Sequence, residues 1–152
     1  MTLCTKPAPI LHQPSNPVVA FDTDLSDLVD SMIETMTAAN GVGLAAVQVG
    51  VPLRVYVARP ARGSESVNVF INPHLHSAYG WYNPGEGCLS VPGLMLAPPR
   101  PRLIHLSWTD LSGASHTAWL DGFAAHVASH ELDHLDGILL DDRYVLGPTQ
   151  NS

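Results

Sequence analysis

The segment between Asp121 and Gly137 constrains the fold most, because it predicts a helix that is apolar on most of its sides. Asp121 is the predicted N-cap residue, and Gly137 is predicted to end the helix. Its apolar side chains are Phe123, Ala124, Val127, Ala128, Leu132 and Leu135. A helix that is hydrophobic all round is buried, so we expect this one at the centre of the molecule, with the rest of the chain packed around it.

The same helix carries the pentapeptide His130-Glu131-Leu132-Asp133-His134, which is typical of a hydrolytic metal site. Residues four apart lie one turn above the other, so His130 and His134 can direct both imidazoles at one ion. Glu131 lies beside the first of these histidines, close enough to reach a water at the metal, where a general base is needed. The pattern therefore predicts half of a metal site together with its base.

A third ligand is needed, because two imidazoles alone leave a site too open to hold its ion. Cys88 is the best candidate, since a thiolate is soft enough for Zn or Fe(II) and the neighbouring Gly87 lets the backbone come close. A structural site built from the same Cys88, His130 and His134 remains an alternative, although structural sites usually complete four protein ligands.

Other histidines compete for the role of ligand. His126, His130 and His134 form a ladder along the helix, but the outer two lie about 12 Å apart at 1.5 Å rise per residue and cannot share one ion. His126 is therefore assigned to the lining of a cleft, together with Val127 and Phe123, which share the helix face of the ligands. The alternative for His126 is that it turns aside and bonds a backbone carbonyl. The remaining histidines are predicted to be surface or hydrogen-bonded polar residues: His12, His74, His76, His105 and His116.

Hydrophobic periodicity predicts the rest of the regular structure. The predicted elements are a helix over 24–40, a hairpin of strands over 53–58 and 67–71, a strand over 103–109 and a further strand that ends at Leu120. Within the helix, Met32 and Met36 are expected to be core residues. The proline-rich stretch from Pro7 to Pro17 is expected to run extended over the surface.

The length of 152 residues fits one domain, predicted to span the whole chain with an extended leader at 1–17 and a tail at 144–152. The net charge of −7 would repel a phosphate backbone, so nucleic acid is not an expected partner. No run approaches the roughly 18 continuous apolar residues of a membrane span, and the N-terminus lacks the apolar core of a signal peptide. We therefore expect a cytoplasmic protein with no membrane partner. Cys4 and Cys88 are too few for a disulfide framework.

Three segments of the chain resemble motifs of the peptide deformylase family. They are Gly41-Val42-Gly43-Leu44-Ala45-Ala46-Val47-Gln48, Glu86-Gly87-Cys88-Leu89-Ser90 and His130-Glu131-Leu132-Asp133-His134-Leu135-Asp136-Gly137, in the family's order. Weaker similarity extends the match from about Pro9 to Arg143. The resemblance implies an α+β fold, in which mixed or antiparallel β-sheets wrap around a central metal-binding helix. It also implies an N-formylmethionyl peptide as substrate and Fe(II) as the metal, which Zn(II), Ni(II) or Co(II) can replace.

The resemblance also implies roles for single residues. The metal ligands would be Cys88, His130 and His134, with Glu131 as the base. Gln48, through its side-chain amide, and Leu89, through its backbone N–H, would stabilise the oxyanion. Gly41 and Gly43 would leave room for the peptide to pair with the enzyme backbone as an added strand. The residues expected to contact the peptide or its methionine side chain are Gly41, Val42, Gly43, Glu86, Gly87, Phe123, His126 and Val127.

The chain departs from the family pattern in three places. Ser129 stands where the family usually has Gln, and Met95 and Leu96 occupy a stretch that often holds an Arg facing the substrate. The chain also ends 15 residues after Gly137, short of the long C-terminal helix by which many bacterial members are thought to meet the ribosome. We therefore expect contacts to the downstream peptide that differ from the family's, and no docking to the ribosome through such a helix.

Three other functions stay open at this point. A zinc peptidase could use the same helix, although a Cys ligand 42 residues upstream of His130 is not its usual pattern. A metallohydrolase that acts on another formylated small molecule would need the same residues. A non-enzymatic Cys/His metal or redox sensor could signal through oxidation of Cys88, but it would have no need of Glu131.

Overall fold

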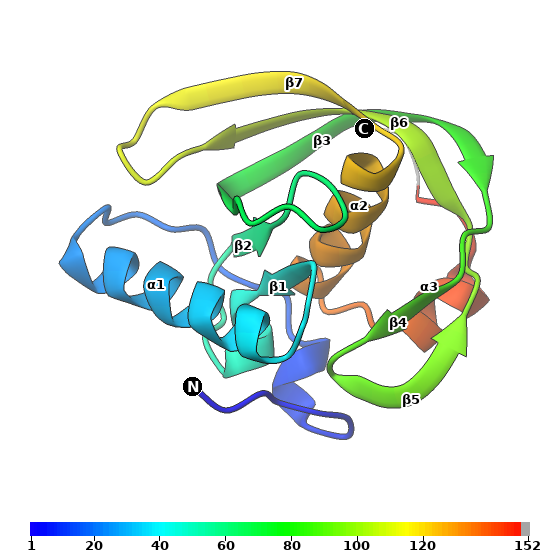
Figure 1. Ribbon diagram of the computed structural model, residues 1–152, viewed down its shortest axis with the longest axis horizontal. Helices are drawn as coiled ribbons and strands as arrows, with labels where there is room; N and C mark the ends of the chain where they lie inside the picture. The colour runs from blue at the N-terminus through cyan, green and yellow to red at the C-terminus, as the bar shows by residue number, and fades with distance from the viewer. Residues whose placement is uncertain (150–152) are drawn as a thin grey trace.

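The computed structural model describes residues 1–149 as an α+β fold built around one helix, α2 (Phe123–Leu135) (Figure 1). A five-stranded sheet packs on α2 in the order β1-β2-β3-β6-β7, and β4 and β5 form a separate hairpin. All pairings within these two sheets are antiparallel, which confirms the expected fold class. The strands are β1 (Gly43–Ala45), β2 (Val55–Ala58), β3 (Asn68–Tyr82), β4 (Glu86–Cys88), β5 (Val91–Leu96), β6 (Arg100–Thr109) and β7 (Ser115–Asp121).

The helix predicted over 24–40 is confirmed as α1 (Thr23–Ala38). The Asp22 side chain caps its N-terminus by accepting a hydrogen bond from the Leu25 N–H at 3.1 Å. Met32 and Met36 are 0% exposed, as expected for core residues. None of the helices within residues 1–149 is long and apolar enough to cross a lipid bilayer.

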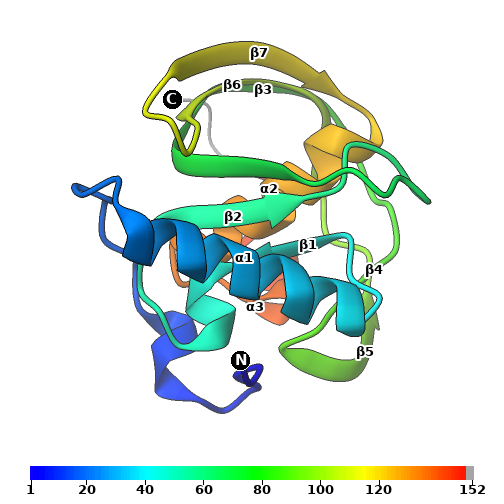
Figure 2. The same ribbon diagram turned by 60° about the vertical axis from the view of Figure 1, so that its left-hand side comes forward.

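Strands β1 and β2 are buried on both faces, because α1 covers one face of the pair and α2 covers the other (Figure 2). On one face, Leu44 and Val57 pack with the apolar stripe of α1. On the other face, Ala45 and Tyr56 pack with the apolar residues of α2. The pairing of Leu44 with Val57 and of Ala45 with Tyr56 keeps each layer continuous. This double burial brings the start of β1 against the middle of α2, where the metal-site pentapeptide lies.

The predicted hairpin and the predicted strand pair are both present, but β3 is much longer than the strand predicted over 67–71. It continues to Tyr82 and pairs with β6 along most of its length. Irregularities between Ile71 and His74 and between Leu75 and Ser77 interrupt its alternation of side chains. That interruption is why hydrophobic periodicity ends the strand too early.

The predicted N-cap of α2 is wrong. Asp121 is the last residue of β7, where it pairs with Leu103, and Gly122 occupies the N-cap position without a side-chain cap. Gly122 has φ +57, a left-handed conformation that lets the chain turn from strand to helix within one residue. The predicted end of the helix holds, because α2 stops at Leu135 and Gly137 has φ +75.

The predicted leader and tail need correction too. Pro9–His12 forms a short 3-10 helix, η1, instead of running extended, because Leu11 turns inward and is fully buried. The predicted tail from 144 overlaps α3 (Leu140–Leu146), which Arg143 ties to Asp133 of α2. Residues 150–152 of that tail lie outside the described residues.

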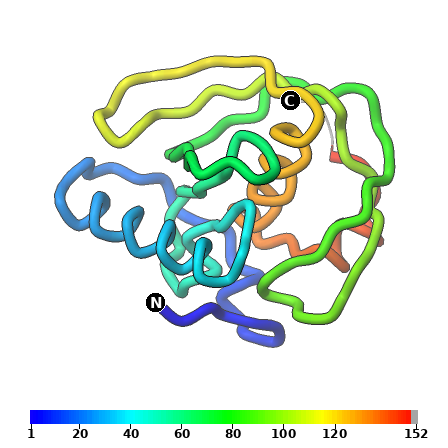
Figure 3. The backbone as a smooth tube through the Cα atoms, viewed as in Figure 1, coloured from blue at the N-terminus to red at the C-terminus, as the bar shows by residue number. Residues whose placement is uncertain are grey.

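The N-terminal segment joins two parts of the fold that carry predicted site residues (Figure 3). The Cys4 N–H donates to the Gln48 carbonyl at 2.7 Å, in the short helix η2 (Ala46–Val49) that follows β1. The Lys6 N–H donates to the Ser90 carbonyl at 2.8 Å, in the turn between β4 and β5. The first residues of the chain therefore hold η2 and the β4–β5 hairpin together.

Gly137→Ala is expected to lower the free energy of unfolding by about 2–3 kcal/mol, because two penalties add at this position. A left-handed φ strains alanine, and a Cβ at Gly137 would lie 2.7 Å from the carbonyl oxygen of His12. Gly113→Ala is the matched control, since Gly113 has φ +86 but no atom within 4 Å of the added carbon. Urea denaturation of both variants at equal metal content should show the larger loss for Gly137→Ala, and equal losses would contradict the contact with His12.

Candidate active site

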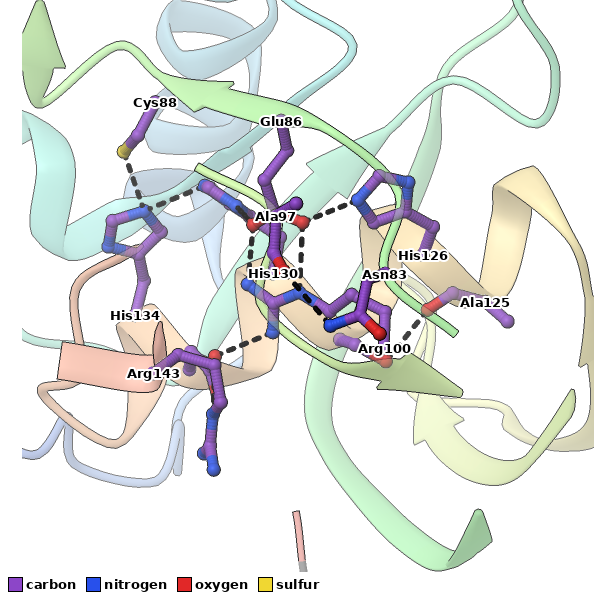
Figure 4. Close-up of polar contacts among 12 residues, drawn as sticks. Asn83, Glu86, Cys88, Ala97, Arg100, Ala125, His126, His130, His134 and Arg143 are labelled. Carbon is purple, nitrogen blue, oxygen red and sulfur yellow. Dashed lines mark hydrogen bonds and ion pairs between the residues drawn. The ribbon is translucent and has the colours of Figure 1, made fainter. Parts of the chain in front are cut away.

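Cys88 at the end of β4 and His130 and His134 on α2 converge on one point (Figure 4). The Cys88 Sγ lies 3.3 Å from the His134 Nε2, which lies 3.2 Å from the His130 Nε2. Within residues 1–149 this is the only group of three or more His, Cys, Asp or Glu side chains whose ligand atoms all lie within 4.8 Å of one another. One soft sulfur and two imidazole nitrogens make a donor set suited to Zn or Fe(II).

Glu86 fixes which nitrogen of His130 faces the other ligand atoms. The His130 Nδ1 lies 2.8 Å from the Glu86 Oε1, which leaves Nε2 directed at His134. A carboxylate behind a ligand imidazole sets its tautomer and its orientation, as is common in metal sites. The arrangement of the three side chains therefore fits a bound metal ion.

Glu86 was expected to contact the substrate, but its carboxylate is buried and fully bonded. Arg100 donates to its Oε2 at 2.9 Å and to its Oε1 at 2.5 Å, and the His126 Nε2 lies 2.5 Å from Oε2 (Figure 4). Burial raises the pKa of Glu86, but the hydrogen bonds from His126, His130 and Arg100 outweigh it and hold the pKa far below its usual range. Glu86 is therefore a permanent carboxylate behind the ligands.

The hydrogen bonds of Glu86 continue through the core to α3. Arg100, which is 1% exposed, also donates to the Asp133 Oδ2 at 2.7 Å. Arg143 of α3 donates to both oxygens of Asp133, at 3.1 and 2.8 Å. Sequence reasoning missed this network, although Asp133 was a signal: a carboxylate in a helix predicted to be buried all round needs a cation beside it.

Glu131 lines the same cleft as Cys88 and His130, two of the three predicted ligands, and is 3% exposed. Its Oε2 has no hydrogen-bond partner within residues 1–149. Burial raises the pKa of Glu131 to about 7, against the opposing effect of a charge on His130. A buried carboxylate with an oxygen left free is available to exchange protons with a bound molecule.

Gln48 is held at the edge of the same site by both ends of its amide. Its Oε1 accepts from the Ala45 N–H at 2.9 Å, and its Nε2 donates to the Ser90 Oγ at 3.1 Å. The Nε2 also lies 4.0 Å from the Cys88 Sγ. Ser90 was not predicted as a site residue, and its hydroxyl in turn donates to the Cys4 carbonyl at 2.8 Å. Leu89, the other predicted oxyanion donor, lies between Cys88 and Ser90 in the turn after β4.

A cleft of about 600 Å³ lies between β1, the β4–β5 hairpin and the start of α2, and Gln48, Cys88, Leu89, His130 and Glu131 border it. All residues expected to contact the substrate are found along it: Gly41, Val42, Gly43, Glu86, Gly87, Phe123, His126 and Val127. His126 lines the cleft and also forms a hydrogen bond. Its partner is the carboxylate of Glu86, not the backbone carbonyl of the alternative. Arg62, from the loop after β2, also lines the cleft and lies over the Phe123 ring at 4.9 Å.

Met95 and Ser129, which differ from the family pattern, have different surroundings. Met95 of β5 lines the cleft and is 69% exposed, so the cleft wall carries a thioether at this point. Ser129 is buried and is not among the residues that line the cleft, and its hydroxyl donates to the Ala125 carbonyl at 2.8 Å. Met95 is therefore placed to affect substrate contacts, whereas Ser129 is bonded within its own helix.

Comparison with known proteins gives one consistent result. The chain is 43% identical over 139 residues to a peptide deformylase from Rhodopirellula baltica, a match that covers 90% of this chain and 69% of that protein. It is similar to the crystal structure of peptide deformylase from Thermotoga maritima, with a TM-score of 0.89 and 35% identity over 93% of this chain and 95% of that one. It is also similar to a Met-Ala-Ser bound class I type b peptide deformylase from Acinetobacter baumannii, with a TM-score of 0.89 and 31% identity over 94% and 97% of the two chains.

The sequence model of the family described as polypeptide deformylase matches residues 1–147, which includes the three motifs and every residue that borders the cleft. The structural similarity covers 93% of this chain, so it is not confined to the metal-site helix. The chain therefore belongs to the peptide deformylase family, whose members are metal-dependent hydrolases that remove the N-formyl group from nascent peptides.

Proposed function

We propose that this chain releases formate from N-formylmethionyl peptides at a metal ion held by Cys88, His130 and His134, with Glu131 as the base. The observation that carries the proposal is the group of three ligand atoms within 4.8 Å of one another, with the buried Glu131 carboxylate in the cleft that Cys88 and His130 line. When bound, the metal supplies the Lewis acidity that lowers the pKa of water toward about 7.

Glu131 moves the proton in this proposal. Its carboxylate accepts a proton from the attacking water and later delivers it to the leaving amine, so that the products are formate and a free N-terminal amine. Glu86, the other carboxylate in the cleft, is unsuited to this role because its oxygens already accept from Arg100, His126 and His130.

Gln48 and Leu89 are proposed to stabilise the oxyanion that forms at the formyl group. The hydrogen bond from Ala45 to the Gln48 Oε1 fixes the orientation of the amide, so its Nε2 stays on the side of Cys88. The Leu89 N–H would be the second donor. Donors that are already oriented matter most where the charge develops, because they need not reorganise during the reaction.

The peptide is proposed to lie along the edge of β1, because this strand pairs only with β2 in the described part of the chain. Gly41 and Val42 lead along that edge, and the methionine side chain would enter between Phe123, His126 and Val127. The peptide deformylase from Acinetobacter baumannii with Met-Ala-Ser bound supports a methionyl peptide as the occupant.

Formate release from formyl-Met-Ala by anaerobically purified protein, with its metal content measured, tests the proposal. Acetyl-Met-Ala and an internal peptide bond should remain intact. Cleavage of the internal bond would identify a peptidase, turnover confined to small formylated metabolites would replace the peptide as substrate, and metal binding without any hydrolysis would favour the sensor.

Fe(II) is the proposed metal, and Cys88→Ser is expected to lower metal retention because a hydroxyl replaces the soft thiolate ligand. Peroxide should inactivate the Fe(II) protein by oxidising the thiolate-bound iron site, and replacement of Fe(II) by Ni(II) or Co(II) should prevent this loss. Metal content after dialysis and activity after peroxide treatment measure the two effects. Equal metal content in Cys88→Ser and the unmodified protein would remove Cys88 from the site.

The domain organisation, the compartment and the partners of the chain are also proposed. The chain is proposed to work as one domain, because the five-stranded sheet and the β4–β5 hairpin both border the active-site cleft. The cytoplasm is the proposed compartment, since formylmethionyl chains are made there. Nucleic acid is not a proposed partner, given the net charge of −7.

A further inference from the structure

Gly43 and Glu131 face each other across the gap between β1 and α2. A Cβ added at Gly43 would lie 2.6 Å from the Glu131 Oε1 and 3.1 Å from its Cδ. The same carbon would lie 2.9 Å from the Val127 Cγ1, one turn earlier on the helix. The carboxylate of Glu131 therefore occupies space that any other residue at position 43 would fill.

From this contact we infer that Gly43 is a positioning residue for the base, and that its missing side chain sets where the Glu131 carboxylate lies. The inference rests on the proposed function, because it gives Gly43 a role through Glu131. It differs from the expectation that Gly43 serves only to let the peptide approach β1.

The backbone conformation does not explain a glycine here. Gly43 is not among the residues with positive φ, so an alanine could adopt its backbone geometry without strain. The requirement is for space beside α2. Position 43 is thus a site where the substitution tests the contact alone.

The backbone around Gly43 cannot easily withdraw from α2. Gly43 pairs with Ala58 of β2, and the Arg59 N–H donates to the Val42 carbonyl at 2.8 Å. The Gly41 N–H donates to the Met36 carbonyl at 2.9 Å, which ties the strand to the end of α1. Because the strand is held on both sides, the added carbon must displace the groups on α2.

Of those groups, Glu131 has the more mobile end. Val127 is β-branched and buried, so its methyl groups have few other places to go. The Glu131 carboxylate ends a flexible side chain, and its Oε2 has no hydrogen bond within the described residues to hold it. To restore an ordinary C···O contact of about 3.3 Å from 2.6 Å, the oxygen must retreat by roughly 0.7 Å.

A displaced base predicts a specific kinetic change in Gly43→Ala. The turnover number should fall about 10- to 100-fold, because proton transfer depends on sub-ångström placement. The KM for a formyl-Met-Ala-Ser substrate should stay within about threefold, and metal content should match the parent protein.

Gly41→Ala is the matched variant, two residues earlier in the segment that leads into β1. A Cβ there would meet the Leu89 Cδ1 at 3.1 Å and the Met36 Cγ at 3.2 Å, and Glu131 is not among its nearest neighbours. Because Gly41 borders the cleft in which the peptide is proposed to lie, this variant should change KM more than the turnover number. A KM effect of equal size in both variants, without loss of turnover in Gly43→Ala, would show that Gly43 serves peptide access and overturn the inference.

Two further measurements tie the effect to Glu131. In a Glu131→Asp background, whose shorter carboxylate withdraws from position 43, Gly43→Ala should cost less than about threefold in turnover. A crystal structure of metal-loaded Gly43→Ala should show the carboxylate displaced while β1 stays in place. An undiminished loss in the Asp background, or an unmoved carboxylate, would overturn the inference. If the parent protein releases no formate from formylated peptides, the proposed function fails instead, and the crystal structure still tests the contact.

Discussion

Glu131→Ala is expected to retain its metal ion and to lose at least about 100-fold in formate release, because the base lies beside the ligands without being one of them. Burial and an oxygen left free make Glu131 the one cleft carboxylate within residues 1–149 that can take a proton, since Glu86 is fully bonded. Steady-state kinetics with formyl-Met-Ala, combined with elemental analysis of the same preparation, measure both parts of the expectation.

Glu131→Gln is the matched variant, because it keeps the size of the side chain and removes only its capacity to accept a proton. Its loss of turnover should be as large as that of Glu131→Ala. If Glu131→Gln kept its activity with metal confirmed, the carboxylate would act through packing and the proposed mechanism would be wrong.

Arg100→Met is expected to lower the free energy of unfolding by about 3–5 kcal/mol, because it leaves two buried carboxylates without their shared cation. Arg100 is 1% exposed and donates to both Glu86 and Asp133. Removing one partner of a buried ion pair costs far more than the pair itself contributes, since the remaining charge stays desolvated. Urea denaturation of the metal-loaded and metal-free variant measures the loss.

Arg102→Met serves as its control, because Arg102 lies two residues further along β6 and is exposed. Its guanidinium lies over the Tyr82 ring at 4.0 Å, a contact expected to contribute about 1 kcal/mol or less at the surface. Similar losses in both variants would mean that the buried network of Glu86, Asp133 and Arg100 carries no special share of the stability.

The sequence predicts the two long helices well, because each has a strong pattern of its own. The apolar stripe of α1 and the all-round apolar surface of α2 follow from residues within each helix. The short strand β1 is not predictable in this way, since three residues buried on both faces show no alternation. The β4–β5 hairpin is rich in Gly and Pro, and its pairing depends on the rest of the fold.

The same distinction holds for the site. His130 and His134 are local to one helix, so their spacing alone brings them together. Cys88 is predicted from chemistry, because two histidines need a third ligand and a thiolate suits the metal. Its role as a ligand remains a prediction. The bonds of Glu86 to Arg100 and His126 join residues 14 and 40 positions apart, and no local pattern reveals such pairings. The contact between Gly43 and Glu131 is equally long-range and was not foreseen.

The edge strand β1 has a consequence for association with other chains. An open strand edge can recruit any extended segment, and long flat edges are therefore prone to aggregate. Here the edge is only three residues long and faces Gly87, Leu89 and Val91 of the opposite hairpin across the cleft. In the proposed function, this short edge receives one extended polypeptide terminus. Within residues 1–149 it offers the edge of a second sheet only three residues to pair with, which disfavours sheet-to-sheet aggregation.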